Sequence, residues 1–194
     1  MMFLLAACGP TEEETTDEET ATDEEAEEMY RETVKQEGRD IAQEAFKAIS
    51  GVLQEKIEEG GIEKGIDYCS VEAIPLTDSV AEAQNAHIKR ISDKPRNPDN
   101  EATSEEVELM NEYRQKMKAG EDLKPTLKQR KGEDVFYAPI AIQEQLCLNC
   151  HGQEEAEIDS EHLSLIRELY PEGQATGYEM GDLRGMWQIA FERE

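Results

Sequence analysis

Residues 123–142, LKPTLKQRKGEDVFYAPIAI, carry the pattern that decides the fold class. Two strand-like runs lie on either side of Lys131-Gly132, and the second run is rich in β-branched and aromatic residues. A glycine between two such runs is typical of a tight turn. The stretch therefore predicts a β-hairpin, and with it an antiparallel sheet.

Two further strands are predicted on either side of this hairpin. HIKRIS at 87–92 alternates well enough for a strand, and KPRNPDN at 94–100 has the composition of a turn. The chain closes with GDLRGMWQIAFERE, a predicted final strand whose apolar positions are Leu183, Met186 or Trp187, Ile189 and Phe191. The hairpin and these strands predict an antiparallel sheet of four or five strands.

Helical patterns occupy much of the remaining chain. Apolar residues recur at helical spacing from Met29 to a stop at Gly60-Gly61, with loosening expected at Gly38 and Gly51. Further helices are expected at 62–75, from Thr77, from a cap at Thr103 or Ser104, and at 160–169. Helices that flank an antiparallel sheet define the fold class as α+β.

The charge of the chain restricts its partners. It has 194 residues with 46 acidic against 20 basic side chains, a formal net charge of −26. Such a chain repels nucleic acid and anionic lipid head groups, so we expect no nucleic-acid partner. A basic protein partner suits this charge better.

The first residues resemble a bacterial lipoprotein signal. In MMFLLAACGP, an apolar run and small residues lead to Cys8, as in a lipobox, although a basic n-region and a long h-region are missing. The stretch predicts a signal over residues 1–8 that ends at a lipidated Cys8. A lipid at this position would anchor the protein to the inner or outer membrane, facing the periplasm. The alternative is a chance cysteine after a short apolar start.

An acidic stretch follows this signal. Residues 11–28, TEEETTDEETATDEEAEE, contain eleven carboxylates, no base and no large apolar residue. Such a segment cannot bury enough apolar surface to offset its ordering entropy. We therefore expect a disordered acidic tether over 9–28 and the folded domain over 29–194.

The motif Cys147-Leu148-Asn149-Cys150-His151 carries the chemistry. On one helical turn, thiols at i and i+3 can add to two vinyl groups of a haem, with the following histidine beneath the iron. A zinc site would need a second pair of ligands, but the remaining candidates, His87, His162 and Cys69, are scattered. A redox dithiol would follow a strand of a βαβ unit and would not need the histidine.

The motif thus predicts one covalent haem c, attached to Cys147 and Cys150. His151 is the expected proximal iron ligand through Nε2, with Nδ1 donating to a carbonyl or a carboxylate. If Cys8 is lipidated, Cys69 has no disulfide partner. Cys69 is therefore a candidate for the second axial ligand, although a small buried core residue explains it equally well. The rival ligands are His87, Met110, Met117, Met180 and Met186.

Four segments in combination carry a family resemblance. They are YCSVEAIP at 68–75, IKRISDKPRNPDN at 88–100, FYAPIAIQEQLCLNCHG at 136–152 and ATGYEMGDLRGMW at 175–187. Over roughly residues 30–194 the chain resembles the Tll-like family of periplasmic c-type haem domains. The resemblance implies a PAS-like antiparallel sheet with flanking helices and one covalent haem. It also implies that His151 and Cys69, the cysteine before the Lys-Pro-Arg-Asn-Pro segment, both bind the iron.

One basic cluster stands out in the acidic chain: Lys89, Arg90, Lys94 and Arg96. Its arginines, Arg90 and Arg96, are candidates for binding the haem propionates, because guanidinium groups suit carboxylates. A solvated strand and turn explains the cluster as well. Asp182 and Arg184 are expected to shape the turn into the last strand.

These predictions favour a membrane-anchored periplasmic haem protein for redox or gas sensing or for electron transfer. A thiolate ligand favours ferric iron, so a low reduction potential is expected, and loss of the thiolate on reduction could open a gas site. The partner would be a redox or signalling protein. The alternative is a haem enzyme of the peroxidase or nitrogen-oxide reductase type, for which only His87 and His162 offer acid–base groups.

Overall fold

One four-stranded sheet, antiparallel throughout, organises the domain. The computed structural model describes residues 22–130 and 132–192. The strands β1 (His87–Ile91), β2 (Thr126–Arg130), β3 (Glu133–Ala141) and β4 (Leu183–Glu192) lie in the order β1-β4-β3-β2. The predicted hairpin is confirmed, because β2 pairs with β3 in a register that places Thr126 opposite Tyr137. The other two predicted strands are confirmed as β1 and β4.

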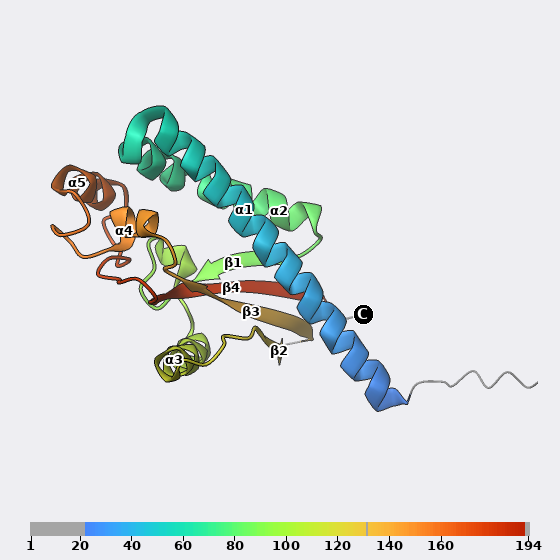
Figure 1. The fold of residues 1–194 in the computed structure, drawn as a ribbon. Coiled ribbons are helices and arrows are strands. Elements are labelled where there is room, and N and C mark those ends of the chain that lie inside the picture. Colours follow the sequence, from blue (N-terminus) through green and yellow to red (C-terminus); the bar gives the residue numbers. More distant parts are fainter. Residues whose placement is uncertain (1–21, 131, 193–194) are drawn as a thin grey trace, which may run out of the picture.

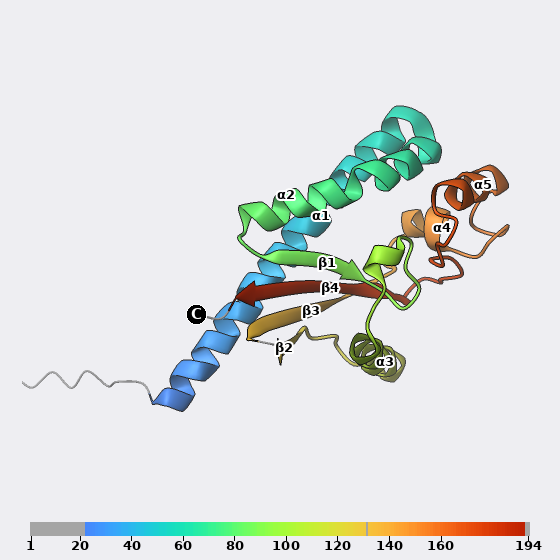
Figure 2. The ribbon, with the colours of Figure 1, turned by 180° about the vertical axis from the view of Figure 1, so that it is seen from behind.

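Helices cover both faces and one end of this sheet (Figure 1). The helices are α1 (Asp23–Val71), α2 (Ala73–Ala83), α3 (Ser104–Ala119), α4 (Gln145–His151) and α5 (Ser160–Leu169), with a short 3₁₀ turn at Pro98–Asn100. The rear view shows α1 and α2 side by side along one face, with α3 on the other (Figure 2). The α+β class is thus confirmed. No helix in the described part of the chain has an apolar run long enough to cross a membrane.

The core has two layers because successive strand residues point to opposite faces. Phe136 of β3, with Trp187 and Ile189 of β4, packs against apolar residues of α1 and α2. Val135 and Tyr137 of β3 pack on the other face, against α3. The central strands are therefore buried on both sides.

Helix α1 differs from the expectation at both ends. Residues 23–28, expected within the disordered tether, are helical, because Thr22 and Glu25 form a capping box and carboxylates stabilise a helix N-terminus. Residues 1–21, including Cys8 and the rest of the tether, lie outside the described residues. The expected stop is a kink at Gly60 and Gly61, where the backbone leaves the helical region, and the helix resumes to Val71. The next helix begins at Ala73 rather than Thr77.

The expected loosening of α1 at Gly38 and Gly51 is wrong, since both residues lie within the regular helix. Gly38 instead packs against the Phe136 ring. A Cβ at Gly38 would lie 2.7 Å from Cδ1 and Cδ2 of that ring, closer than side chains pack. The glycine therefore permits the close approach of α1 to the sheet.

Replacement of Gly38 by alanine is expected to lower the free energy of unfolding by about 1–3 kcal/mol, because the fully buried Phe136 cannot move aside. The matched control is Gly51→Ala, where no heavy atom lies within 4 Å of the added Cβ. That control is expected to stabilise the protein by about 0.5–1 kcal/mol, since alanine favours the helix. Urea unfolding of both variants measures the difference, and equal effects would contradict the packing account.

A buried carboxylate joins α3 to the sheet. The Glu106 side chain is only 4% exposed. It accepts hydrogen bonds from the backbone and hydroxyl of Thr103, from Tyr137 Oη at 3.2 Å, from Arg130 Nη1 at 3.1 Å and from Gln188 Nε2. Burial alone would raise the pKa of Glu106, but these hydrogen bonds and the Arg130 charge together lower it.

Because the pKa of Glu106 is lowered, the contribution of this residue to the free energy of unfolding is expected to depend on pH. Its carboxylate stabilises the fold above the pKa of the unfolded chain, and this contribution is lost as pH falls through the folded-state pKa. At pH 7, Glu106→Gln is expected to cost about 1–3 kcal/mol, and the difference from wild type should shrink in acid. Urea unfolding at a series of pH values, from pH 7 into acid, tests the prediction. The control is Glu105→Gln, a change to the neighbouring exposed residue. A difference that is constant with pH would contradict it.

Candidate functional site

The Cys-x-x-Cys-His motif forms α4, a short helix that follows β3 at the end of the sheet. Cys147 and Cys150 are partly buried, free of disulfide bonds and one helical turn apart. Cys147 packs against a cluster that includes Ala175 and Tyr178. Cys150 packs against a second cluster, made by Ile158, by α5 and by the last turns of α1. The helix is therefore fixed from both sides, with its thiols on one face.

His151, the last residue of α4, is held by one of its ring nitrogens. Nδ1 lies 2.9 Å from the Ala175 carbonyl oxygen, and this acceptor assigns the proton to Nδ1. Nε2 is then left with its lone pair, which is the arrangement of a metal-binding histidine. The Ala175 carbonyl is thus the acceptor that lies within reach of Nδ1. Burial, with smaller effects of Arg184 and Arg96, holds the pKa of His151 well below its ordinary value, so the imidazole is neutral.

Main-chain hydrogen bonds keep Ala175 in place. The loop before β4 runs along α4, where the amides of Gly177 and Tyr178 donate to the carbonyls of Gly152 and His151 at 2.7 and 3.0 Å. Farther along, the amide of Gly181 donates to the carbonyl of Ile142, the residue that follows β3. This loop therefore fixes the orientation of the imidazole ring.

Two arginines lie beside Nδ1 of the imidazole. Arg96 donates to the carbonyls of Cys150 and Ala175, the latter at 2.8 Å, and its Nη2 lies 3.4 Å from His151 Nδ1. Arg184 Nε lies at the same distance from Nδ1, and its Nη1 donates to Ser92 Oγ at 3.1 Å. Burial lowers the pKa of Arg184 to about 10, and it stays charged at neutral pH.

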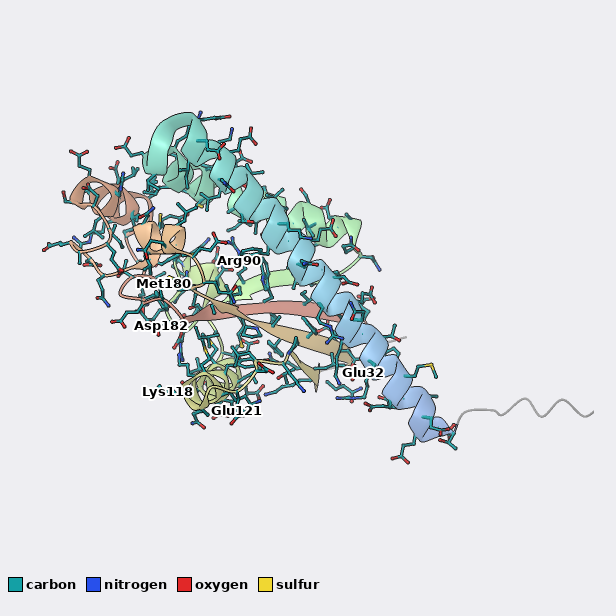
Figure 3. The ribbon with its side chains drawn as sticks, in the orientation of Figure 1. Glu32, Arg90, Lys118, Glu121, Met180 and Asp182 are labelled. Carbon is teal, nitrogen blue, oxygen red and sulfur yellow. The ribbon has the colours of Figure 1, made fainter. Side chains whose placement is uncertain are left out.

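The role predicted for Arg184 was incomplete. It was expected only to shape the turn into β4, and it instead reaches the histidine of the motif. Asp182 does shape that turn, since its carboxylate accepts from the Glu179 amide at 2.9 Å. Figure 3 shows Asp182 with Met180 in the loop close to α4. An arginine in GDLRG carries no sequence signal for a site, because only the fold brings it to His151.

Cys69 lies near the end of α1 and faces α4. Ile66, one turn earlier on the same helix face, packs in the cluster that Cys150 joins. Burial raises the pKa of the Cys69 thiol, while the charges of Arg90 and Arg96 oppose this rise. Burial, and then the proximity of Cys69, raises the pKa of Cys150 to about 11. The structure therefore brings Cys69, Arg90 and Arg96 together with the motif.

The rival ligands lie elsewhere or point away. Met110 and Met186 are fully buried in the cluster beneath α3, and Met117 packs against that cluster. Met180 is 49% exposed in the loop before β4. His87 is exposed at the start of β1. Cys69 is thus the candidate that the fold supports.

The basic cluster divides into different roles. Lys89 is exposed, and Lys94 donates to the Thr176 carbonyl at 2.5 Å. Arg96 uses one amino group, Nη2, on the carbonyls of Cys150 and Ala175. Arg90, partly buried, makes no hydrogen bond or ion pair with any residue in the described ranges 22–130 and 132–192. All the donors of Arg90 are therefore left for a ligand.

These residues fit a haem as far as their own chemistry goes. Two thiols lie one turn apart, a neutral imidazole offers Nε2, and a third sulfur atom, that of Cys69, lies nearby. Among the described residues, Arg90, Arg96 and Arg184 pair with no carboxylate, and burial lowers the pKa of each guanidinium. Partly buried like charges are costly unless an anion compensates them, and a haem brings carboxylates.

The fold and the site together define a class, that of α+β domains with one Cys-x-x-Cys-His site at the end of an antiparallel sheet. The chain belongs to the Tll0287-like family, whose family model matches residues 11–191. The resemblance carried by the four sequence segments is thereby confirmed.

A solved structure has the same fold. The chain is similar to a protein described as the cyanobacterial heme-protein Tll0287, with 21% sequence identity and a TM-score of 0.60. The match covers 90% of this chain and 98% of that chain. At this identity the likeness concerns the fold. A comparison with curated proteins found no match.

Proposed function

We propose that this chain is a c-type haem protein that carries one haem on Cys147, Cys150 and His151. The observation that carries the proposal is the hydrogen bond from His151 Nδ1 to the Ala175 carbonyl at 2.9 Å, which leaves Nε2 for iron. The similar solved protein is described as a heme-protein, which supports the same cofactor. A bound haem supplies one-electron redox chemistry and a site for diatomic gases.

Cys69 is the proposed second axial ligand. Its position near the end of α1, close enough to Cys150 to raise the pKa of that thiol, supports this role. A thiolate ligand stabilises ferric iron and lowers the reduction potential. A Cys69 thiolate that takes up a proton would leave, and one coordination position would open. The function that follows is redox or gas sensing, or electron transfer at low potential.

Arg90 is the proposed partner of a haem propionate, because it has no other hydrogen bond among the described residues. Arg96 was an equal candidate in the sequence, but its Nη2 group already donates to the carbonyls of Cys150 and Ala175. We therefore assign Arg96 to positioning the α4 backbone and the acceptor of His151.

The alternative, a haem enzyme, has less support. It needs acid–base groups at the iron, and the two remaining histidines do not provide them. His87 is exposed at the start of β1, and His162 is partly exposed on α5. Neither makes a hydrogen bond with a residue of the site within the described chain.

The proposed location and partners rest on the sequence alone. A lipidated Cys8 would hold the protein at the inner or outer membrane, facing the periplasm, where haem c is attached. The net charge of −26 supports a basic redox or signalling protein as partner and disfavours nucleic acid.

Co-expression with a haem c maturation system tests the proposed cofactor. The purified protein is expected to show an alkaline pyridine haemochrome spectrum, and its haem should remain after acid–acetone extraction. The Cys147→Ser/Cys150→Ser variant should lose covalent haem, while Cys69→Ser should keep it. Haem that is absent from the wild type, or fully extractable from it, would contradict the proposal.

A further inference from the structure

Tyr68, the residue before Cys69, has an unusual hydroxyl. Its side chain is buried, with 8% exposure. Among the residues that the structure describes, Tyr68 Oη is the one buried side-chain oxygen or nitrogen without a hydrogen-bond partner. Leaving such a group unsatisfied costs about 1–3 kcal/mol, so a buried hydroxyl of this kind requires an explanation.

Arg90 points toward the same region from the sheet. It pairs across the strands with Trp187 and lies two residues after Ile88, and both of these belong to the core cluster under α1 and α2. Directly opposed residues and residues two apart share one face of a sheet, so Arg90 also faces those helices. Figure 3 shows Arg90 on the side of β1 that faces α1. Its charge acts on both the Tyr68 hydroxyl and the Cys69 thiol.

Tyr68 and Arg90 therefore offer hydrogen-bond donors in one place, and neither has an acceptor among the described residues. A water molecule could satisfy the hydroxyl, but it would leave the guanidinium charge uncompensated. An anion satisfies both groups, and a carboxylate suits them best, because it accepts several hydrogen bonds and pairs with arginine.

We propose that Tyr68 and Arg90 together form the binding site for one haem propionate, with the Tyr68 hydroxyl as its second donor. This inference rests on the proposed function, since it concerns how that haem is held. The same helix end then supplies an axial ligand, Cys69, and a propionate donor, Tyr68. A movement of Cys69 away from the iron would therefore be coupled to the propionate through the adjacent residue of α1.

The experiment compares the holoproteins of wild type and Tyr68→Phe by resonance Raman spectroscopy and redox titration. In the variant, the propionate bending band is expected to shift to lower frequency, because a hydrogen bond is lost. The reduction potential should become more negative, because the carboxylate charge near the iron is less compensated. Arg90→Gln should change both readouts in the same direction.

The matched control is Tyr113→Phe, which removes a hydroxyl that is buried in the core and donates to Thr126 at 2.9 Å. It should leave the propionate band and the potential unchanged. The pyridine haemochrome of each sample is measured first. Its absence from the wild type overturns the proposed function, whereas its presence makes the Raman result a test of Tyr68.

Two outcomes would overturn the inference. One is a propionate band and a potential that Tyr68→Phe leaves unchanged. The other is a change in the iron–thiolate band alone, which would assign the Tyr68 hydroxyl to the Cys69 sulfur. If Tyr68→Phe does not yield folded holoprotein, Arg90→Gln and Arg90→Lys are compared instead. Lysine keeps the positive charge, so Arg90→Lys should show a smaller shift of the propionate band than Arg90→Gln if a carboxylate binds there.

Discussion

The Cys69→Ala variant is expected to lose the low-spin thiolate spectrum of the ferric protein and to bind CO rapidly when reduced. The structure predicts this result because the fold brings the Cys69 sulfur close to Cys150 of the motif, while Met110 and Met186 are buried in another part of the core. Without the thiolate the reduction potential should rise by an amount on the order of 100 mV, since axial ligands set haem potentials over about 0.8 V.

The control for this prediction is Cys69→Met, which keeps a sulfur ligand but removes its charge. That variant should stay low-spin, yet its potential should rise, which separates the loss of a ligand from the loss of a charge. Optical spectra, CO titration and redox potentiometry provide the readouts. A Cys69→Ala protein with the wild-type spectrum and potential would show that Cys69 is only a core residue.

Replacement of Arg96 by leucine is the second change with a large expected effect. Its guanidinium donates to the carbonyls of Cys150 and Ala175, so its loss removes a charged donor from the Cys150 carbonyl and one of the two donors from the Ala175 carbonyl, which is the acceptor of His151. We expect the free energy of unfolding to fall by about 2–4 kcal/mol. The haem iron should also become partly high-spin, because the imidazole is less well held.

The control here is Lys89→Met, a change of similar size to an exposed residue of the same basic cluster. It should alter the stability by less than about 0.5 kcal/mol and leave the spectrum unchanged. Urea unfolding and the ferric optical spectrum measure both effects. Equal stability of the two variants would argue against a positioning role for Arg96.

The fold class could be predicted from local patterns. Alternation around Gly132 predicted the hairpin, and capping residues predicted helices α3 and α5. At the start of α1, the acidic composition predicted a disordered tether, and this prediction was wrong for residues 23–28. The acidic stretch is polar throughout, yet the capping box of Thr22 and Glu25 begins a helix there that continues onto the sheet. The role of Gly38 could not be predicted, because it depends on Phe136, which is far away in the sequence.

The candidate site was predictable only in part, for a related reason. Cys147, Cys150 and His151 lie within about one helical turn, so their spacing in the sequence is enough to predict haem c attachment. Spacing alone left Cys69 undecided, and the family resemblance singled it out. Arg184 and Tyr68 lie in segments that carry the resemblance, but neither was assigned to the haem site from the sequence. Arg184 belongs to the site because it reaches His151. Tyr68 is of interest because its buried hydroxyl has no hydrogen-bond partner among the described residues. Both properties depend on the folded chain.

Axial ligation by His151 and Cys69 is the central claim, and low-temperature EPR of the ferric holoprotein tests it most directly. The account predicts one low-spin signal with the anisotropy typical of a thiolate bound opposite an imidazole. A high-spin signal, or a low-spin signal typical of two nitrogen ligands or of a methionine, would contradict it.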